Sequence, residues 1–168
     1  SSAPSEVMEQ EQIRELLSGI ILDLDNYKQI YSALAQYVAE MNRSIVTVTG
    51  VSSGVDWFNN VNESKNQSSG VIIAQNGKQL LILTDYSPVK QADDIIVTFN
   101  KGTQADASLK EKDETTGLAV IAVELDVLNE DFLKNDITIA TLGSSNIRDI
   151  AGLPVVALGR PMGINGSL

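Results

Sequence analysis

The spacing of apolar residues changes at residue 44 from that of a helix to that of a β-strand. The segment SIVTVTGV at 44–51 alternates along the chain, and β-branched runs separated by turn residues continue to the end. QNGK at 75–78 and NKGT at 100–103 supply the Asn and Gly of hairpin turns. The pattern therefore predicts a mainly β, antiparallel barrel or sandwich. The predicted strands are 44–51, 70–75, 79–84, 95–99, 104–109, 118–125, 137–142 and 153–159.

The N-terminal part of the sequence has a helical pattern instead. Residues 1–9, rich in Ser, Pro and Glu, are expected to be a linker, followed by a helical segment at 10–42 and the β domain at 43–168. We expect a first helix to about Leu24 and a second that Asp25 caps. The second helix carries one apolar stripe, which either docks on its own domain or has an oligomerising or stalk role. The stripe comprises Tyr27, Ile30, Tyr31, Leu34, Val38 and Met41.

Composition limits the chemistry. The chain has 168 residues, 43% of them hydrophobic, enough for one globular domain. Its net charge of −10 would repel phosphate backbones, so nucleic acid is not an expected partner. The sequence contains no Cys and no His, which excludes histidine-dependent triads, thiol nucleophiles and Cys/His zinc sites. We expect no metal and no cofactor.

Five segments, in order, resemble the HtrA/DegP-like family of trypsin-fold serine proteases. They are SSGVIIAQNGKQLLILT at 68–84, TDYSPV at 84–89, TGLAVI at 116–121, ATLGSS at 140–145 and VVALGRPMG at 155–163. The resemblance covers about residues 43–168 and implies the first barrel of a trypsin-like domain, with the start of the second. It places Ser87 at the family's catalytic histidine and Gly117 at its catalytic aspartate. The family's nucleophile motif, Gly-x-Ser-Gly-Gly, does not occur in these residues.

These two replacements remove the base and the acid that orients it. A serine hydroxyl cannot take up the nucleophile's proton at neutral pH, and loss of the base costs several orders of magnitude in rate. We therefore expect no catalytic residues in this chain. Two less favoured alternatives remain open: a carboxylate pair drawn from Asp85 and Asp113-Glu114, and a dyad of Ser87 with Lys90.

The resemblance predicts a catalytically inactive binding or scaffolding module of the bacterial cell envelope. We expect an extracytoplasmic location and a membrane anchor upstream of Ser1. The expected partner is a protein or peptide, and Trp57 and Phe58, in a polar loop at 52–69, are candidate contacts. Self-association through the N-terminal helices or an exposed barrel face is also expected. The alternatives are an active serine endopeptidase whose nucleophile lies beyond Leu168, and a purely structural spacer.

Overall fold

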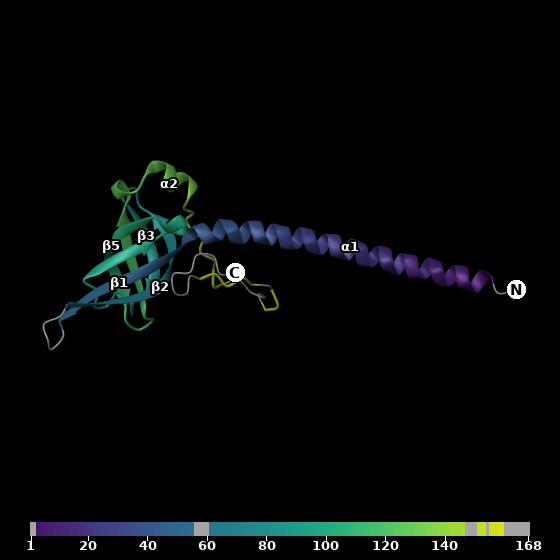
Figure 1. Cartoon of the computed structure of the whole chain (residues 1–168), viewed down its shortest axis with the longest axis horizontal. Helices are drawn as coiled ribbons and strands as arrows, with labels where there is room; N and C mark the ends of the chain where they lie inside the picture. Colours follow the sequence, from purple (N-terminus) through teal and green to yellow (C-terminus); the bar gives the residue numbers. More distant parts are fainter. Residues whose placement is uncertain (1–2, 56–60, 147–150, 154, 160–168) are drawn as a thin grey trace. The chain divides into compact units, whose positions relative to one another are not determined.

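The computed structural model describes residues 3–55, 61–146, 151–153 and 155–159. The chain divides into two compact units, residues 1–39 and 40–168. Helix α1 spans Ala3–Met41, and the six strands follow it in the sequence (Figure 1). Within the described part of the chain, no helix is long and apolar enough to cross a membrane.

Helix α1 is continuous, so two predictions for the N-terminal part are wrong. The helix begins at Ala3 within the expected linker, and it runs through Asp25, the expected N-cap of a second helix. Pro4 is compatible with this start because proline is tolerated in the first turn of a helix. Gly19 costs only about 1 kcal/mol of helix stability. The carboxylate of Asp25 lies 3.8 Å from the Lys28 ammonium one turn later, and neither residue interrupts the helix.

The second unit is a closed antiparallel barrel, which confirms the predicted fold class. Neighbouring strands follow the order β1-β2-β3-β6-β5-β4. The strands are β1 Ile45–Val55, β2 Val61–Gln75, β3 Gln79–Asp85, β4 Asp94–Thr98, β5 Gln104–Asp113 and β6 Leu118–Glu124. The predicted hairpin turns are present, with φ of 85° at Gly77 and 87° at Gly102. These values explain why glycine occupies both turns.

The polar segment predicted as a loop at 52–69 is largely a β-ribbon. Strand β1 continues to Val55 and β2 begins at Val61, with pairing from Ser52↔Ser64 outward to Val55↔Val61. Polar residues are compatible with this ribbon, because its side chains are largely exposed along most of its length. Trp57 and Phe58, the candidate partner contacts, lie outside the described residues.

The chain after β6 also differs from the prediction. Residues 137–142, and the described residues of 153–159, do not form strands. Single hydrogen bonds hold the first segment instead: the backbone N–H of Ala140 donates to the Ile72 carbonyl at 2.8 Å. A short helix, α2 (Glu130–Asn135), was not predicted, although Asn129 caps it by accepting a bond from the Asp131 N–H at 2.8 Å.

The barrel interior is filled by aliphatic side chains and closed at one end by aromatic contact. Phe132 of α2 packs edge-on against Phe99, with ring centroids 5.2 Å apart. The nonpolar residues buried completely are Val46, Val48, Ile72, Leu80, Ile82, Val97, Phe99, Ile121 and Val123.

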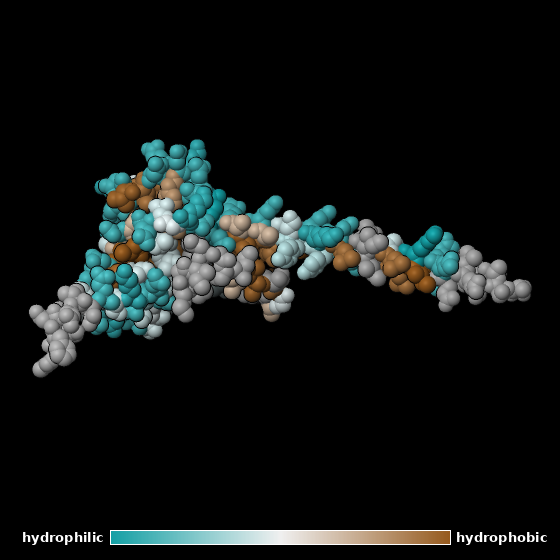
Figure 2. Space-filling view, viewed as in Figure 1, coloured by the Kyte–Doolittle hydropathy of each residue, from teal (hydrophilic) through white to brown (hydrophobic). Residues whose placement is uncertain are grey.

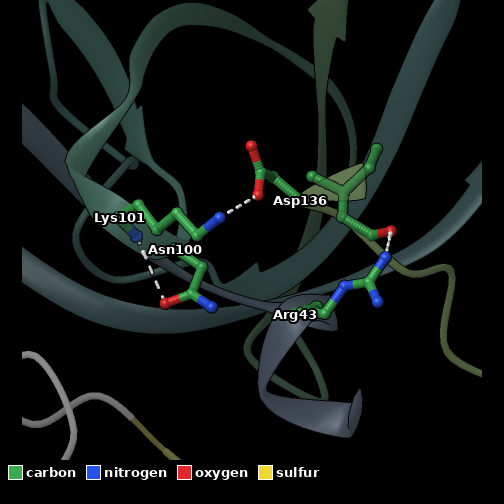
Figure 3. Close-up of polar contacts among 5 residues, drawn as sticks. Arg43, Asn100, Lys101 and Asp136 are labelled. Atoms are coloured by element: carbon green, nitrogen blue, oxygen red, sulfur yellow. Dashed lines mark hydrogen bonds and ion pairs between the residues drawn. The ribbon is translucent and has the colours of Figure 1, made fainter. Parts of the chain in front are cut away.

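Polar contacts hold the segment after α2 against the same end of the barrel (Figure 3). The Arg43 guanidinium donates from Nη2 to the Ile137 carbonyl at 3.1 Å, and the Lys101 ammonium pairs with the Asp136 carboxylate. This end lies where β1 begins and β4 finishes. The turns that carry residues 87 and 117 therefore lie at the opposite end, where β3 finishes and β6 begins.

Candidate functional site

Two turns meet at this second end of the barrel. One joins β3 to β4 and carries Ser87, and the other joins β5 to β6 and carries Gly117. Asp85 pairs with Leu118 in the ladder between β3 and β6, and the Tyr86 N–H donates to the Gly117 carbonyl at 2.8 Å. The fold thus places in adjacent turns the two positions that the resemblance assigned to the catalytic histidine and aspartate.

The turn between β3 and β4 lies directly on β1. A Cβ atom on Gly50 would be only 1.8 Å from the Pro88 carbonyl oxygen, so only glycine allows this approach. The Asp93 N–H donates to the Val51 carbonyl at 2.8 Å, and its carboxylate accepts bonds from the N–H and hydroxyl of Ser53, each at 2.7 Å. The bond from the Ser53 N–H, and to a smaller extent the bond from the Ser53 hydroxyl, lowers the pKa of the Asp93 carboxyl. The turn is therefore fixed to β1 at several points.

Tyr86 lies close to two lysine ammonium groups. Lys112 Nζ donates to the tyrosine hydroxyl at 3.1 Å and lies 5.1 Å from the ring centroid, and Lys90 Nζ lies 5.9 Å from that centroid. Lys112 also pairs with Glu114 at 2.5 Å. The bonds to Glu114 and Tyr86 raise the pKa of Lys112. The raised pKa favours the charged ammonium of Lys112, whereas a serine–lysine dyad requires a neutral amine.

The carboxylates near Gly117 hold the turn in place. Asp113 accepts bonds from the Thr116 hydroxyl and the Thr115 N–H, both at 2.9 Å, and these bonds lower the pKa of its carboxyl. The bond from Lys112 lowers the pKa of Glu114. A carboxylate whose pKa is held below its ordinary value is a weak base at neutral pH. Neither acid has the raised pKa that a catalytic carboxyl near neutrality needs.

A hollow of about 330 Å³ lies beside the Gly117 turn, on the outer wall of β3, β6 and β5. Outward-facing Leu83, Leu118 and Val120 supply its apolar side chains, while Lys112 and Thr116 are among its polar residues. Leu118 is 39% exposed. Such an apolar surface with nearby polar groups is typical of a shallow binding site.

Sequence reasoning missed both the hollow and the contacts around Tyr86. The hollow had a signal in the alternation of β6, where Leu118 and Val120 face away from the buried Ala119 and Ile121. The pairing of Tyr86 with Lys112 depends on a register between distant strands and had no local signal. No group of three or more acidic, His or Cys residues suited to a metal ion occurs among the residues that the structure describes.

Comparison with known proteins identifies the family. A family model described as the trypsin-like peptidase domain matches residues 68–168. The chain belongs to this family. It is 32% identical over 106 residues to a protein of Halomonas elongata named "Probable periplasmic serine endoprotease DegP-like", a match that covers 63% of this chain and 20% of the relative. A solved structure, the serine endoprotease from Yersinia pestis, matches 53% of this chain and 28% of its own at 28% identity, with a TM-score of 0.42.

The family match supports a trypsin-fold assignment, in agreement with the closed six-stranded barrel. The chain spans about a fifth of the length of the DegP-like relative. Within this trypsin-like domain, Ser87 is exposed in its turn and Gly117 adopts a φ of 72°. The sequence contains no histidine.

Proposed function

We propose that this trypsin-like domain binds protein or peptide ligands and does not cleave them. The observation that carries the proposal is the placement of Ser87 and Gly117 in adjacent turns, in a sequence without histidine. The site that would hold the base and its orienting acid in an active relative is therefore formed by a hydroxyl and a glycine. Neither can accept a proton from a nucleophile at neutral pH.

The neighbouring ionisable groups support the same conclusion. Asp113 and Glu114 have lowered pKa values, and the raised pKa of Lys112 keeps its amine protonated. A general base works best when its pKa lies near the operating pH. These groups are committed to holding the turn and to the contact with Tyr86, so they do not replace the missing imidazole.

The hollow beside Gly117 is the proposed binding surface. Its apolar side chains, Leu83, Leu118 and Val120, would bury a nonpolar side chain of the ligand. A shallow hollow suits an extended peptide segment better than an enclosed small molecule. The name of the Halomonas elongata relative supports an extracytoplasmic location, with a membrane anchor upstream of Ser1 as part of the proposal.

Fluorophosphonate labelling tests the absence of catalysis. The complete natural polypeptide is incubated with the probe beside an active HtrA-type protease as a positive control. We expect no labelling of the folded protein, because fluorophosphonates require an activated serine. Labelling would show that another group activates a nucleophile, and it would favour the active endopeptidase.

Binding is tested with fluorescein-labelled casein, an unstructured protein, by fluorescence anisotropy. Leu118→Asp places a charge in the hollow, and Val127→Asp is the matched control on an exposed residue in the turn after β6. We expect Leu118→Asp to weaken binding by about tenfold, equivalent to about 1.4 kcal/mol, and Val127→Asp to leave it unchanged. Equal binding by both variants, or no binding by the parent chain, would favour a purely structural spacer.

A further inference from the structure

The apolar residues of α1 repeat in heptads over most of the helix. From Ile13 to Met41 their spacing alternates strictly between four and three residues. One core position of the heptad holds Leu17, Leu24, Tyr31 and Val38. The other holds Ile13, Tyr27, Leu34 and Met41, with isoleucine also at residue 20. Such a repeat, sustained over four heptads, is the sequence pattern of a coiled coil.

The exact period distinguishes a helical partner from a globular one. A helix that packs on a globular domain needs an apolar face with a period of about 3.6 residues. A period of 3.5 keeps one seam in contact with another helix only when both supercoil. The pattern of α1 has the second period, so it favours another helix as the occupant of this face.

The face offers enough surface for a stable association. Within the described part of α1, Leu16 is 67% exposed, Tyr27 65% and Ile30 69%. Figure 2 shows hydrophobic residues at the surface along this helix. The described helix has nine exposed large hydrophobic residues, and burial of roughly 100 Å² by each would remove about 900 Å² per helix. A stable interface buries about 800 Å² per partner.

The charges beside the seam indicate a second copy of this chain in a parallel register. Asp23 and Lys28 occupy the two heptad positions that flank the core, five residues apart. In a parallel, in-register coiled coil, these positions of neighbouring helices face each other and form ion pairs. Two identical helices would therefore bring Asp23 of one copy to Lys28 of the next. In an antiparallel pair, each flanking position would face the same position of the partner helix, so Asp23 and Lys28 would not be brought together.

We propose that α1 assembles three or four copies of this chain into a parallel, in-register coiled coil. In the N-terminal heptads, leucine occupies the core position of Leu17 and Leu24, and isoleucine occupies the other core position. This combination favours coiled coils of three or four helices over two. Leu16, Ile30 and Tyr37 flank the seam and widen its apolar face beyond that of a two-stranded coil. The inference does not depend on the proposed binding function. Linked copies would present several barrels to one ligand and raise its avidity.

The molar mass of the folded chain in solution tests the copy number. Sedimentation equilibrium should give three or four times the 18.1 kDa of one chain. Leu24→Asp puts charge into the seam and should yield monomers, whereas Gln29→Asp, at the heptad position farthest from the seam, should keep the assembly. Thermal unfolding shows that the barrel stays folded in each variant. A monomeric or dimeric parent chain, or equal effects of both substitutions, would overturn the proposal.

Disulfide trapping tests the orientation, which is simple in a chain without cysteine. Leu17→Cys and Leu34→Cys, made separately, should each form disulfides between identical chains on oxidation, and Gln36→Cys should not. Crosslinking only when the first two variants are mixed would indicate antiparallel helices and overturn the proposed register. Asp23→Lys and Lys28→Asp should each weaken assembly by several-fold, and the double variant should restore it. Failure of the double variant to recover would contradict the proposed ion pair.

Discussion

Gly50→Ala tests how closely the turn that carries Ser87 packs on β1. The added Cβ would lie 1.8 Å from the Pro88 carbonyl oxygen and 2.8 Å from its carbonyl carbon. A carbon and a carbonyl oxygen approach to about 3.3 Å without penalty, so the turn must move by more than 1 Å. Because the obstacle is backbone, a change of rotamer cannot relieve it.

We expect this substitution to lower the free energy of unfolding by roughly 3 kcal/mol, at the upper end of overpacking effects. The midpoint of thermal unfolding should fall by about 10 °C in a barrel of this size, measured by circular dichroism. Gly77→Ala is the matched control, since its Cβ would meet open space and only its φ of 85° opposes the change. The control should cost about 1 kcal/mol. Equal, small effects of the two substitutions would refute the close approach.

Two further predictions concern the core and the Gly117 turn. Phe99→Ala removes a completely buried ring and its contact with Phe132, and should lower the free energy of unfolding by about 3–5 kcal/mol in denaturant titrations. Tyr27→Ala on α1 is the control. In the monomeric Leu24→Asp background, it should not change the unfolding of the barrel. Asp113→Asn should destabilise the turn at neutral pH, because the folded-state pKa of Asp113 is lowered and its carboxylate contributes stability above its ordinary pKa of 3.8. That contribution is lost as pH falls through the lowered pKa. The difference in unfolding free energy between parent and variant should therefore shrink in acid. A difference that stays constant with pH would contradict the bonds to Thr115 and Thr116.

The β fold was predictable because its signals are local. Alternating residues in β3 and β6 and the glycines at 77 and 102 mark strands and turns without reference to the rest of the chain. The ribbon from Ser52 to Ser64 was missed because cross-strand pairing, and not residue type, makes its polar segments strands. Residues 137–142 looked like a strand but form only isolated bonds to the barrel.

The site was partly predictable for a related reason. The resemblance gave the positions of Ser87 and Gly117, and the barrel ladder then brought their turns together through the bond from Tyr86. The pairing of Lys112 with Tyr86 depends on how β5, β6 and β3 align, which no short segment encodes. A local signal can also mislead. Asp25 was predicted to cap a second helix, but α1 continues through it, because a residue that favours a cap also fits inside an exposed helix.

The left-handed backbone of Gly117 limits how protease chemistry could be engineered into this domain. An aspartate at this position would have to adopt a φ of 72°, at a cost of about 1–2 kcal/mol. Its Cβ would meet no described atom within 4 Å apart from its chain neighbours, so the backbone conformation and not crowding opposes the substitution. A designer who places an acidic side chain at residue 117 would also have to change the shape of the turn. The shape of this turn therefore restricts the choice of residue 117 independently of any catalytic role.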